Sequence, residues 1–122
     1  MIARDRAVPY SRGDIYLHPS ATLDYTTSIG HRTLVEKDCI LQKDVKLEET
    51  LLGVGCQVGV GSILHDCVVG DHVIIGEGCV LTKCVIMGDV VVGDGVSLTK
   101  CTLGERVKIS PNVSLEKVRI HK

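Results

Sequence analysis

The sequence predicts an all-β fold, a parallel β-helix of about six coils with three short strands in each coil. Three regularities indicate it: an aliphatic residue returns every five or six positions, a small or apolar residue precedes it by two, and glycine recurs just after it. The composition agrees, because 44% of the 122 residues are hydrophobic although Phe and Trp are absent and only three residues are Tyr. A core without large aromatic side chains indicates a narrow, repetitive interior.

The aliphatic repeat begins at Leu17 and sets the size of a coil. Steps of six positions run as far as Leu47, after which one step in three shortens to five, so each later coil is shorter by one position. The aliphatic positions are Leu17, Leu23, Ile29, Val35, Leu41, Leu47, Leu52, Val58, Leu64, Val69, Ile75, Leu81, Ile86, Val92, Leu98, Leu103, Ile109, Leu115 and Ile120. No window sustains the apolar spacing of an amphipathic helix, so helices are not expected.

Each aliphatic residue ends a predicted strand. The residue two positions earlier is apolar, Thr or Ser in every repeat, and side chains two apart lie on the same side of a strand. Inward-facing pairs therefore predict strands at 15–17, 21–23, 27–29, 33–35, 39–41, 45–47, 50–52, 56–58, 62–64, 67–69, 73–75, 79–81, 84–86, 90–92, 96–98, 101–103, 107–109, 113–115 and 118–120. The residues between the strands form the corners of a triangular prism.

Glycine marks these corners in two places. Seven glycines directly follow the aliphatic residue, at Gly30, Gly53, Gly59, Gly70, Gly76, Gly93 and Gly104, and four lie two positions further on, at Gly55, Gly61, Gly78 and Gly95. Both sets are expected to relieve turns with unusual backbone angles. Asp, Asn and Lys fill the rest of the corners as solvated residues.

One domain accounts for the chain: residues 1–14 are expected to form an extended lead-in that caps the first coil, and residues 15–122 the β-helix. The apolar runs are too short to cross a bilayer. The first residues also have no apolar core of the kind found in a secretion signal. A net charge of −1 without a basic stripe argues against nucleic-acid binding.

All six cysteines occupy the inward position that precedes the aliphatic residue: Cys39, Cys56, Cys67, Cys79, Cys84 and Cys101. No C-x-x-C pair is present, so we interpret them as small buried residues rather than metal ligands. Reduced thiols are expected, and with them an intracellular, cytoplasmic protein.

The sequence predicts no catalytic, cofactor-binding or metal-binding residues. The five histidines, His18, His31, His65, His72 and His121, occupy corner or outward positions and are expected to be scattered over the faces, whereas a metal site needs ligands that converge. From Leu47 to Ile120 the repeat has no insertion that would fold over a substrate. We therefore expect a scaffold that binds no small molecule.

The outward columns of the prism suggest where a partner binds. On two faces the column mixes apolar and polar residues. On the third it reads Tyr16, Leu34, Leu51, Val68 and Val85 before changing to Thr102 and Arg119. An exposed, continuous apolar strip is typical of a protein-interaction surface, although strand propensity alone would also place Val and Leu there.

The repeats, as in VGDHVIIGEGCVL, resemble the hexapeptide-repeat family, and this resemblance implies that the coils are left-handed. The lead-in residues Ser11, Arg12, Ile15 and Tyr16 further resemble the epsilon subunit of eukaryotic translation initiation factor 2B, which has an S-R-x-x-I-Y stretch at the start of its β-helix. The repeats cover residues 15–122, whereas the specific motif covers only the short stretch that enters the first coil.

The resemblance implies a part in the guanine-nucleotide exchange factor for initiation factor 2. An epsilon subunit has a nucleotidyltransferase-like domain, a β-helix and a helical exchange domain, and this sequence corresponds to the middle part. Its expected role is to associate with other subunits, a gamma-like subunit above all, or with itself. The alternatives are the oligomerisation β-helix of a sugar-nucleotide pyrophosphorylase of the mannose-1-phosphate guanylyltransferase kind, a dynactin pointed-end subunit, and a hexapeptide acyltransferase.

Overall fold

The computed structural model describes residues 10–12 and 14–121, which form three sheets of short strands. Sheet A contains β1 (Tyr10–Arg12), β2 (Ile15–Leu17), β5 (Thr33–Val35), β8 (Leu51–Leu52), β11 (Val68–Val69), β14 (Val85–Ile86), β17 (Thr102–Leu103) and β20 (Arg119–Ile120). Sheet B contains β3 (Thr22–Leu23), β6 (Ile40–Leu41), β9 (Gln57–Val58), β12 (Ile74–Ile75), β15 (Val91–Val92) and β18 (Lys108–Ile109). Sheet C contains β4 (Ser28–Ile29), β7 (Lys46–Glu48), β10 (Ile63–His65), β13 (Val80–Thr82), β16 (Ser97–Thr99) and β19 (Ser114–Glu116).

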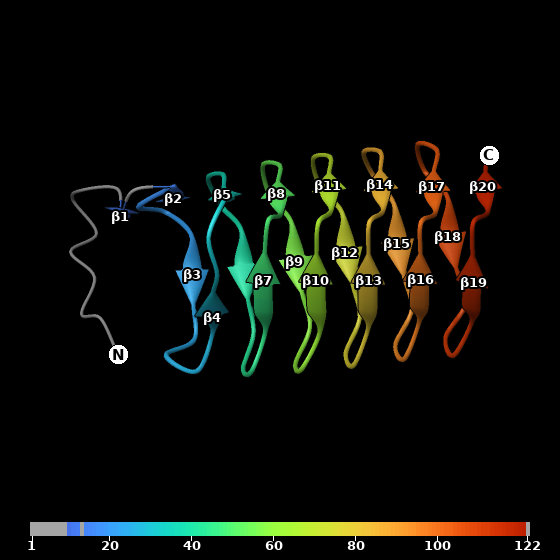
Figure 1. The fold of residues 1–122 in the computed structure, drawn as a ribbon, viewed down its shortest axis with the longest axis horizontal. Helices are drawn as coiled ribbons and strands as arrows, with labels where there is room; N and C mark the ends of the chain where they lie inside the picture. Colours follow the sequence, from blue (N-terminus) through green and yellow to red (C-terminus); the bar gives the residue numbers. More distant parts are fainter. Residues whose placement is uncertain (1–9, 13, 122) are drawn as a thin grey trace.

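These strands wind into a solenoid (Figure 1), as the repeat predicts. From β2 onward the chain visits sheets A, B and C in turn, and each strand pairs in parallel with the strand one coil away. Many strands begin one residue later than predicted, because the small inward residue lies at the corner and the pairing starts after it. Within the described residues no helix is long and apolar enough to cross a membrane.

The register confirms the change in coil length. In the first coil, Ile15 pairs with Thr33 and Ser28 pairs with Lys46, which is the longer spacing. After the first coil, Leu51 pairs with Val68 and Ile74 with Val91, so the partner lies one position nearer along the chain. Because the register then never slips, every outward column continues in a straight line along the solenoid.

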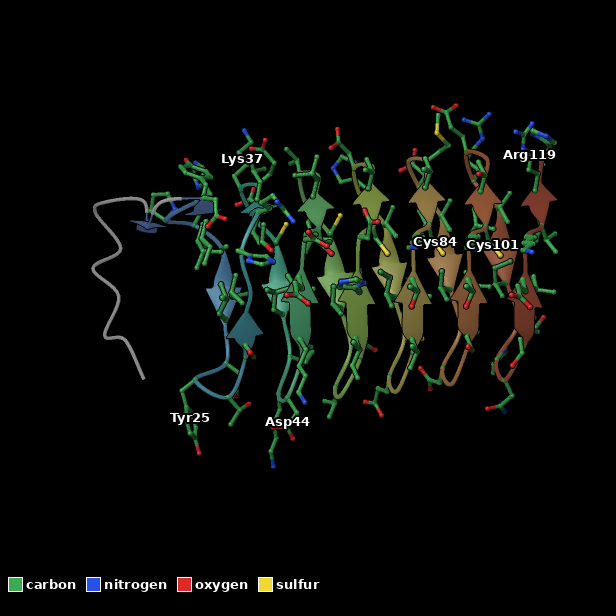
Figure 2. The ribbon with its side chains drawn as sticks, viewed as in Figure 1. Tyr25, Lys37, Asp44, Cys84, Cys101 and Arg119 are labelled. Carbon is green, nitrogen blue, oxygen red and sulfur yellow. The ribbon has the colours of Figure 1, made fainter. Side chains whose placement is uncertain are left out.

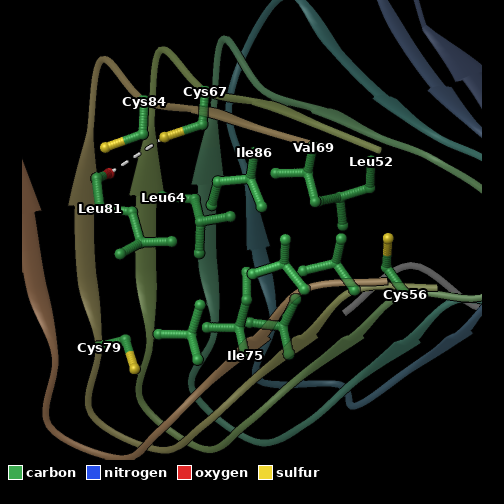
Figure 3. Close-up of a cluster of buried hydrophobic side chains, with 14 of the residues drawn as sticks. Leu52, Cys56, Leu64, Cys67, Val69, Ile75, Cys79, Leu81, Cys84 and Ile86 are labelled. Atoms are coloured by element: carbon green, nitrogen blue, oxygen red, sulfur yellow. Dashed lines mark hydrogen bonds between the residues drawn. The ribbon is translucent and has the colours of Figure 1, made fainter. Parts of the chain in front are cut away.

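The core is the interior of the prism, where the predicted inward pairs meet (Figure 3). The middle coils are fully closed: Leu64, Leu81 and Leu98 each have no exposed surface. At the two ends the inward residues are only partly buried, including Leu23 and Leu115. Branched aliphatic side chains fill this narrow space as the composition predicts.

The corners have two kinds of glycine, and the prediction that all of them relieve strained turns is wrong for one kind. Gly61, two positions beyond the aliphatic residue, has φ +72°, a left-handed conformation that glycine adopts freely. Gly59, directly after the aliphatic residue, does not have a positive φ. There a Cβ atom would lie 2.7 Å from the backbone of Gly76 in the next coil, so glycine is needed for close stacking.

The lead-in departs from parallel pairing. β1 runs antiparallel to β2, with Tyr10 opposite Leu17, and so covers one edge of sheet A. We expected residues 1–14 to form an extended cap; residues 1–9 and 13 lie outside the described residues.

Candidate interaction face

The outer face of sheet A has the longest unbroken apolar column, which we call the outer ridge: Tyr16, Leu34, Leu51, Val68 and Val85. Strand pairing stacks these residues in successive coils. Tyr16 and Leu34 are half-buried, whereas the side chains of Leu51, Val68 and Val85 are 45%, 48% and 42% exposed. A single outward column results because each strand is so short that only one of its residues points away from the core.

The other two faces also expose aliphatic residues, but polar residues interrupt them. On sheet B, the exposed Ile40 and Ile74 are separated by Gln57. On sheet C, Ile63 and Val80 lie between Lys46 and Ser97. The outer face of sheet A, which carries the outer ridge, is therefore the face with the most continuous exposed apolar surface.

A column of charged residues follows the corner that leads into sheet A, and we call it the charged corner. It reads Arg32, Glu49, Asp66, Lys83, Lys100 and Lys117, all with φ between 51° and 58°. Sequence reasoning did not single out this column, although reading the residue before each inward position at the coil repeat would have revealed it. From Glu49 onward the charge changes sign once, from negative to positive between Asp66 and Lys83, beside Val68 and Val85 at one end of the outer ridge.

Backbone hydrogen bonds hold the charged corner in place. The amide of Asp66 donates to the carbonyl of Glu48 at 3.0 Å, and the amide of Lys83 donates to that of His65 at 2.9 Å. The amides of Lys100 and Lys117 donate in the same way to Thr82 and Thr99, both at 2.9 Å. The positions of the charges are thus fixed by the stack, even though the side chains extend into solvent.

At the acidic end of this corner, ionisable side chains from three coils meet. Arg32 forms an ion pair with Glu49, and this hydrogen bond lowers the pKa of Glu49 and raises the pKa of Arg32. The Nε2 atom of His31 lies 3.3 Å from a Glu48 oxygen, and that of His65 lies 3.5 Å from the other. Two histidines thus flank one glutamate across successive coils.

The prediction that all histidines are scattered is therefore wrong for His31 and His65, because stacking brings them to the same glutamates. The two histidines are far apart along the sequence. Their separation equals two coils, however, so stacking places both beside the coil that lies between them. His18 contacts Ser20 instead, with the Ser20 hydroxyl 2.9 Å from Nδ1. In the described part of the chain, no group of three or more His, Cys, Asp or Glu residues is arranged to hold a metal ion.

The six cysteines are buried and free, at the inward position where the sequence places them. The structure adds that their thiols are hydrogen-bond donors: Cys67 Sγ lies 3.3 Å from the carbonyl oxygen of Leu81 in the next coil (Figure 3). Cys39 Sγ donates to Gly53 in the same way, at 3.0 Å. The neighbouring Cys84 thiol raises the pKa of Cys67, and burial, which disfavours the thiolate, raises it as well.

The lead-in motif falls on the two strands of the N-terminal hairpin. Ser11 pairs with Tyr16, and Arg12 pairs with Ile15, so the structure brings together the two halves of the motif. Tyr16 is also the first residue of the outer ridge. The motif and the ridge therefore lie on the same sheet.

Comparison with protein families gives one match. The model described as "EIF2B subunit epsilon LbH domain", where LbH stands for left-handed β-helix, matches residues 12–120. No protein with a curated function matches the chain by sequence.

Two solved structures have the same fold. A mutant of perosamine N-acetyltransferase from Caulobacter crescentus, in complex with CoA and GDP-perosamine, superposes with a TM-score of 0.82 at 16% identity. The superposition covers 88% of this chain and 53% of the acetyltransferase, so this chain spans about half of that protein. A hexapeptide transferase family protein from Anaplasma phagocytophilum gives a TM-score of 0.55 at 17% identity, covering 83% and 74% of the two chains. These similarities, together with the family match, confirm a left-handed β-helix.

Proposed function

Because the chain belongs to the family of the left-handed β-helix domain of EIF2B subunit epsilon, we propose that it is a non-catalytic assembly domain of such a subunit. Its role is to bind other protein subunits in the guanine-nucleotide exchange factor for initiation factor 2, in the cytoplasm. A gamma-like subunit is the expected partner within that complex. The nucleotide exchange itself belongs to another domain of the subunit.

The observation that carries this proposal is the outer ridge. Leu51, Val68 and Val85 expose nearly half of their side-chain surface in an unbroken column on a flat sheet. Burying this column against a partner would remove apolar surface from water, which stabilises a complex by about 25 cal/mol for each Å² that is buried. Charged residues at the edge of the sheet would supply the polar rim that surrounds the core of an interface.

The two transferases with the same fold have too low a sequence identity for their chemistry to be assigned to this chain. The pairing of the described strands runs without a slip from β5 to β20, so no inserted loop folds over a substrate in that range. The two histidines that do come together lie on the surface, where His31 contacts Glu48 and His65 contacts Glu49. We therefore propose assembly rather than acyl transfer.

The test replaces Leu51 and Val68 together with Glu in the full-length epsilon-like subunit and co-expresses it with its gamma-like partner. Charges in the centre of the contact would remain desolvated and unpaired, so we expect at least a tenfold loss of co-purified partner. Thermal unfolding of the variant should stay close to that of the wild type, because both side chains point outward.

The matched control replaces Ile40 and Ile74 with Glu, since these residues are 38% and 42% exposed on sheet B. This control should retain the partner. Full retention of the partner by the Leu51→Glu, Val68→Glu variant would refute the ridge as the assembly surface.

A further inference from the structure

The basic half of the charged corner consists of Lys83, Lys100 and Lys117, which we call the lysine column. Strand pairing places these residues in successive coils, about 4.8 Å apart along the solenoid. All three are exposed, and among the described residues they and Arg119 form no ion pair. Like charges at this spacing repel one another, and an anionic partner would relieve that repulsion.

The acidic half of the charged corner, in contrast, is already neutralised at its start within the chain. Glu49 forms an ion pair with Arg32, and one of its oxygens lies 3.4 Å from Nε2 of His65. Asp66 and Glu116 are the acidic neighbours of the lysine column, and in the described part of the chain neither forms an ion pair. Unpaired positive charge is therefore concentrated in the C-terminal coils.

The lysine column occupies backbone positions that favour glycine. Its three residues have φ of 55°, 56° and 58°, in the left-handed region. At the corner between sheets B and C, the left-handed residues of the same coils are Gly78, Gly95 and Asn112, which adopt this conformation more readily than lysine does. Packing does not select lysine here, because all three side chains are exposed. A contact outside the chain gives a reason for lysine at all three positions.

The lysine column runs along the edge of sheet A that borders the outer ridge. Val85, the last residue of the ridge, lies two positions after Lys83, and the outward column then continues with Thr102 and Arg119. Figure 2 shows Arg119 at the end of the solenoid, extending outward from β20. A partner that covers the outer ridge therefore meets positive charge at the C-terminal end of sheet A.

We propose that the lysine column binds carboxylates of the same protein subunit that covers the outer ridge, so that this partner lies in one direction along the solenoid. The inference rests on the proposed function for the choice of surface, and it adds the charge of the partner and the direction in which it docks. Lysine is a compact charge on a flexible stem, so the column selects the sign of the partner's charge rather than a fixed geometry.

A nucleic acid fits the lysine column less well than an acidic protein surface does. The column spans only two coil spacings, about 10 Å, which is short for a track along a phosphate backbone. Two carboxylates of this chain, those of Asp66 and Glu116, also lie beside it and would repel phosphates.

Binding kinetics of the full-length epsilon-like subunit with its gamma-like partner test the inference. Replacing Lys100 and Lys117 together with Glu should lower the association rate constant by about tenfold or more at low salt, because attraction becomes repulsion. The wild-type rate constant should fall as the salt concentration rises, whereas that of the variant should not. Lys100→Arg, Lys117→Arg keeps the charge and should keep both the rate constant and its salt dependence.

The matched control replaces Lys43 and Lys108 with Glu, which changes the net charge by the same amount. These exposed lysines lie at the corner opposite sheet A and on the outer face of sheet B. The control should stay within about twofold of the wild-type rate constant, because its charges lie away from the contact. Equal slowing in the two Glu variants would overturn the inference, since net charge alone would then account for the effect.

The remaining outcomes separate this inference from the proposed function. If Leu51→Glu, Val68→Glu removes the partner while the lysine variant binds unchanged, the proposed function stands and this inference fails. If the ridge variant keeps the partner and the lysine variant loses it, the lysine column binds the partner and the outer ridge does not. A lysine variant that loses affinity only for a single-stranded RNA oligonucleotide would assign the column to nucleic acid and overturn the inference.

Discussion

At the residue scale, the inward position before each aliphatic residue does more than fill space. Where this position is not aliphatic, it is Cys, Ser or Thr, and each of these is small and can donate a hydrogen bond to a carbonyl group near the corner. The Ser62 hydroxyl donates to Gly76 in the next coil at 2.7 Å, as the Cys79 thiol donates to Gly93 at 3.1 Å. The cysteines are therefore buried donors as well as small side chains.

This leads to a prediction for one column of sheet A. Thr50→Val should destabilise the fold by about 1–2 kcal/mol, because Val keeps the shape but loses a hydroxyl that lies 2.8 Å from the carbonyl oxygen of Glu48. Cys67→Val, one coil further on, should cost less, because a thiol is a weak donor. Urea unfolding of both variants measures the difference. Equal losses would show that the hydroxyl contributes no more to stability than the thiol does.

At the element scale, strands of two or three residues cannot fix the fold by themselves, so the corners determine how the coils stack. One kind of corner position needs a left-handed backbone. Asp44, Gly61 and Asn112 occupy that position in different coils with φ of 60°, 72° and 62°. The other kind, such as Gly59, needs the absence of a side chain.

The two kinds of glycine should respond differently to substitution. Gly59→Ala places a methyl group against the backbone of Gly76, and should cost about 1–3 kcal/mol or more. Gly61→Asn should stay within about 1 kcal/mol of the wild type, because Asn tolerates the left-handed conformation and a Cβ there meets nothing within 4 Å. Thermal and urea unfolding compare the pair. A larger loss in Gly61→Asn would contradict the distinction.

At the scale of the whole molecule, the solenoid is stabilised unevenly along its length. Strand amides donate to carbonyl groups of the following coil, as Val91 donates to Val107 and Thr102 to Val118. Within the described residues, the strands β18, β19 and β20 have no following coil to receive such bonds. Their inward residues are also less buried than those of the middle coils.

Amide hydrogen exchange of the isolated chain should follow this gradient. The amides of Lys108, Ser114 and Arg119 should exchange quickly, whereas those of Val91, Ser97 and Thr102, one coil earlier, should be protected. Mass spectrometry or NMR of the monomer at low concentration provides the measurement. Equal protection in both coils would mean that something other than a following coil covers the end of the solenoid.

The sequence by itself determined the fold class, the coil length, the buried columns and the outer ridge. It could do so because alternation along a strand and return after one coil are regularities of local spacing. The constant register that pairs Leu51 with Val68 follows directly from the repeat. The burial of the cysteines follows from the same spacing.

Only the tertiary structure decided what lies together across coils and how the corners are built. His31 and His65 meet Glu48, Gly59 stacks on Gly76, and β1 turns back against β2. The change of charge between Asp66 and Lys83 likewise acquires its position beside the outer ridge only in the stack. These features depend on distances of a few ångströms between coils and on the φ of single residues, which a repeat pattern does not specify.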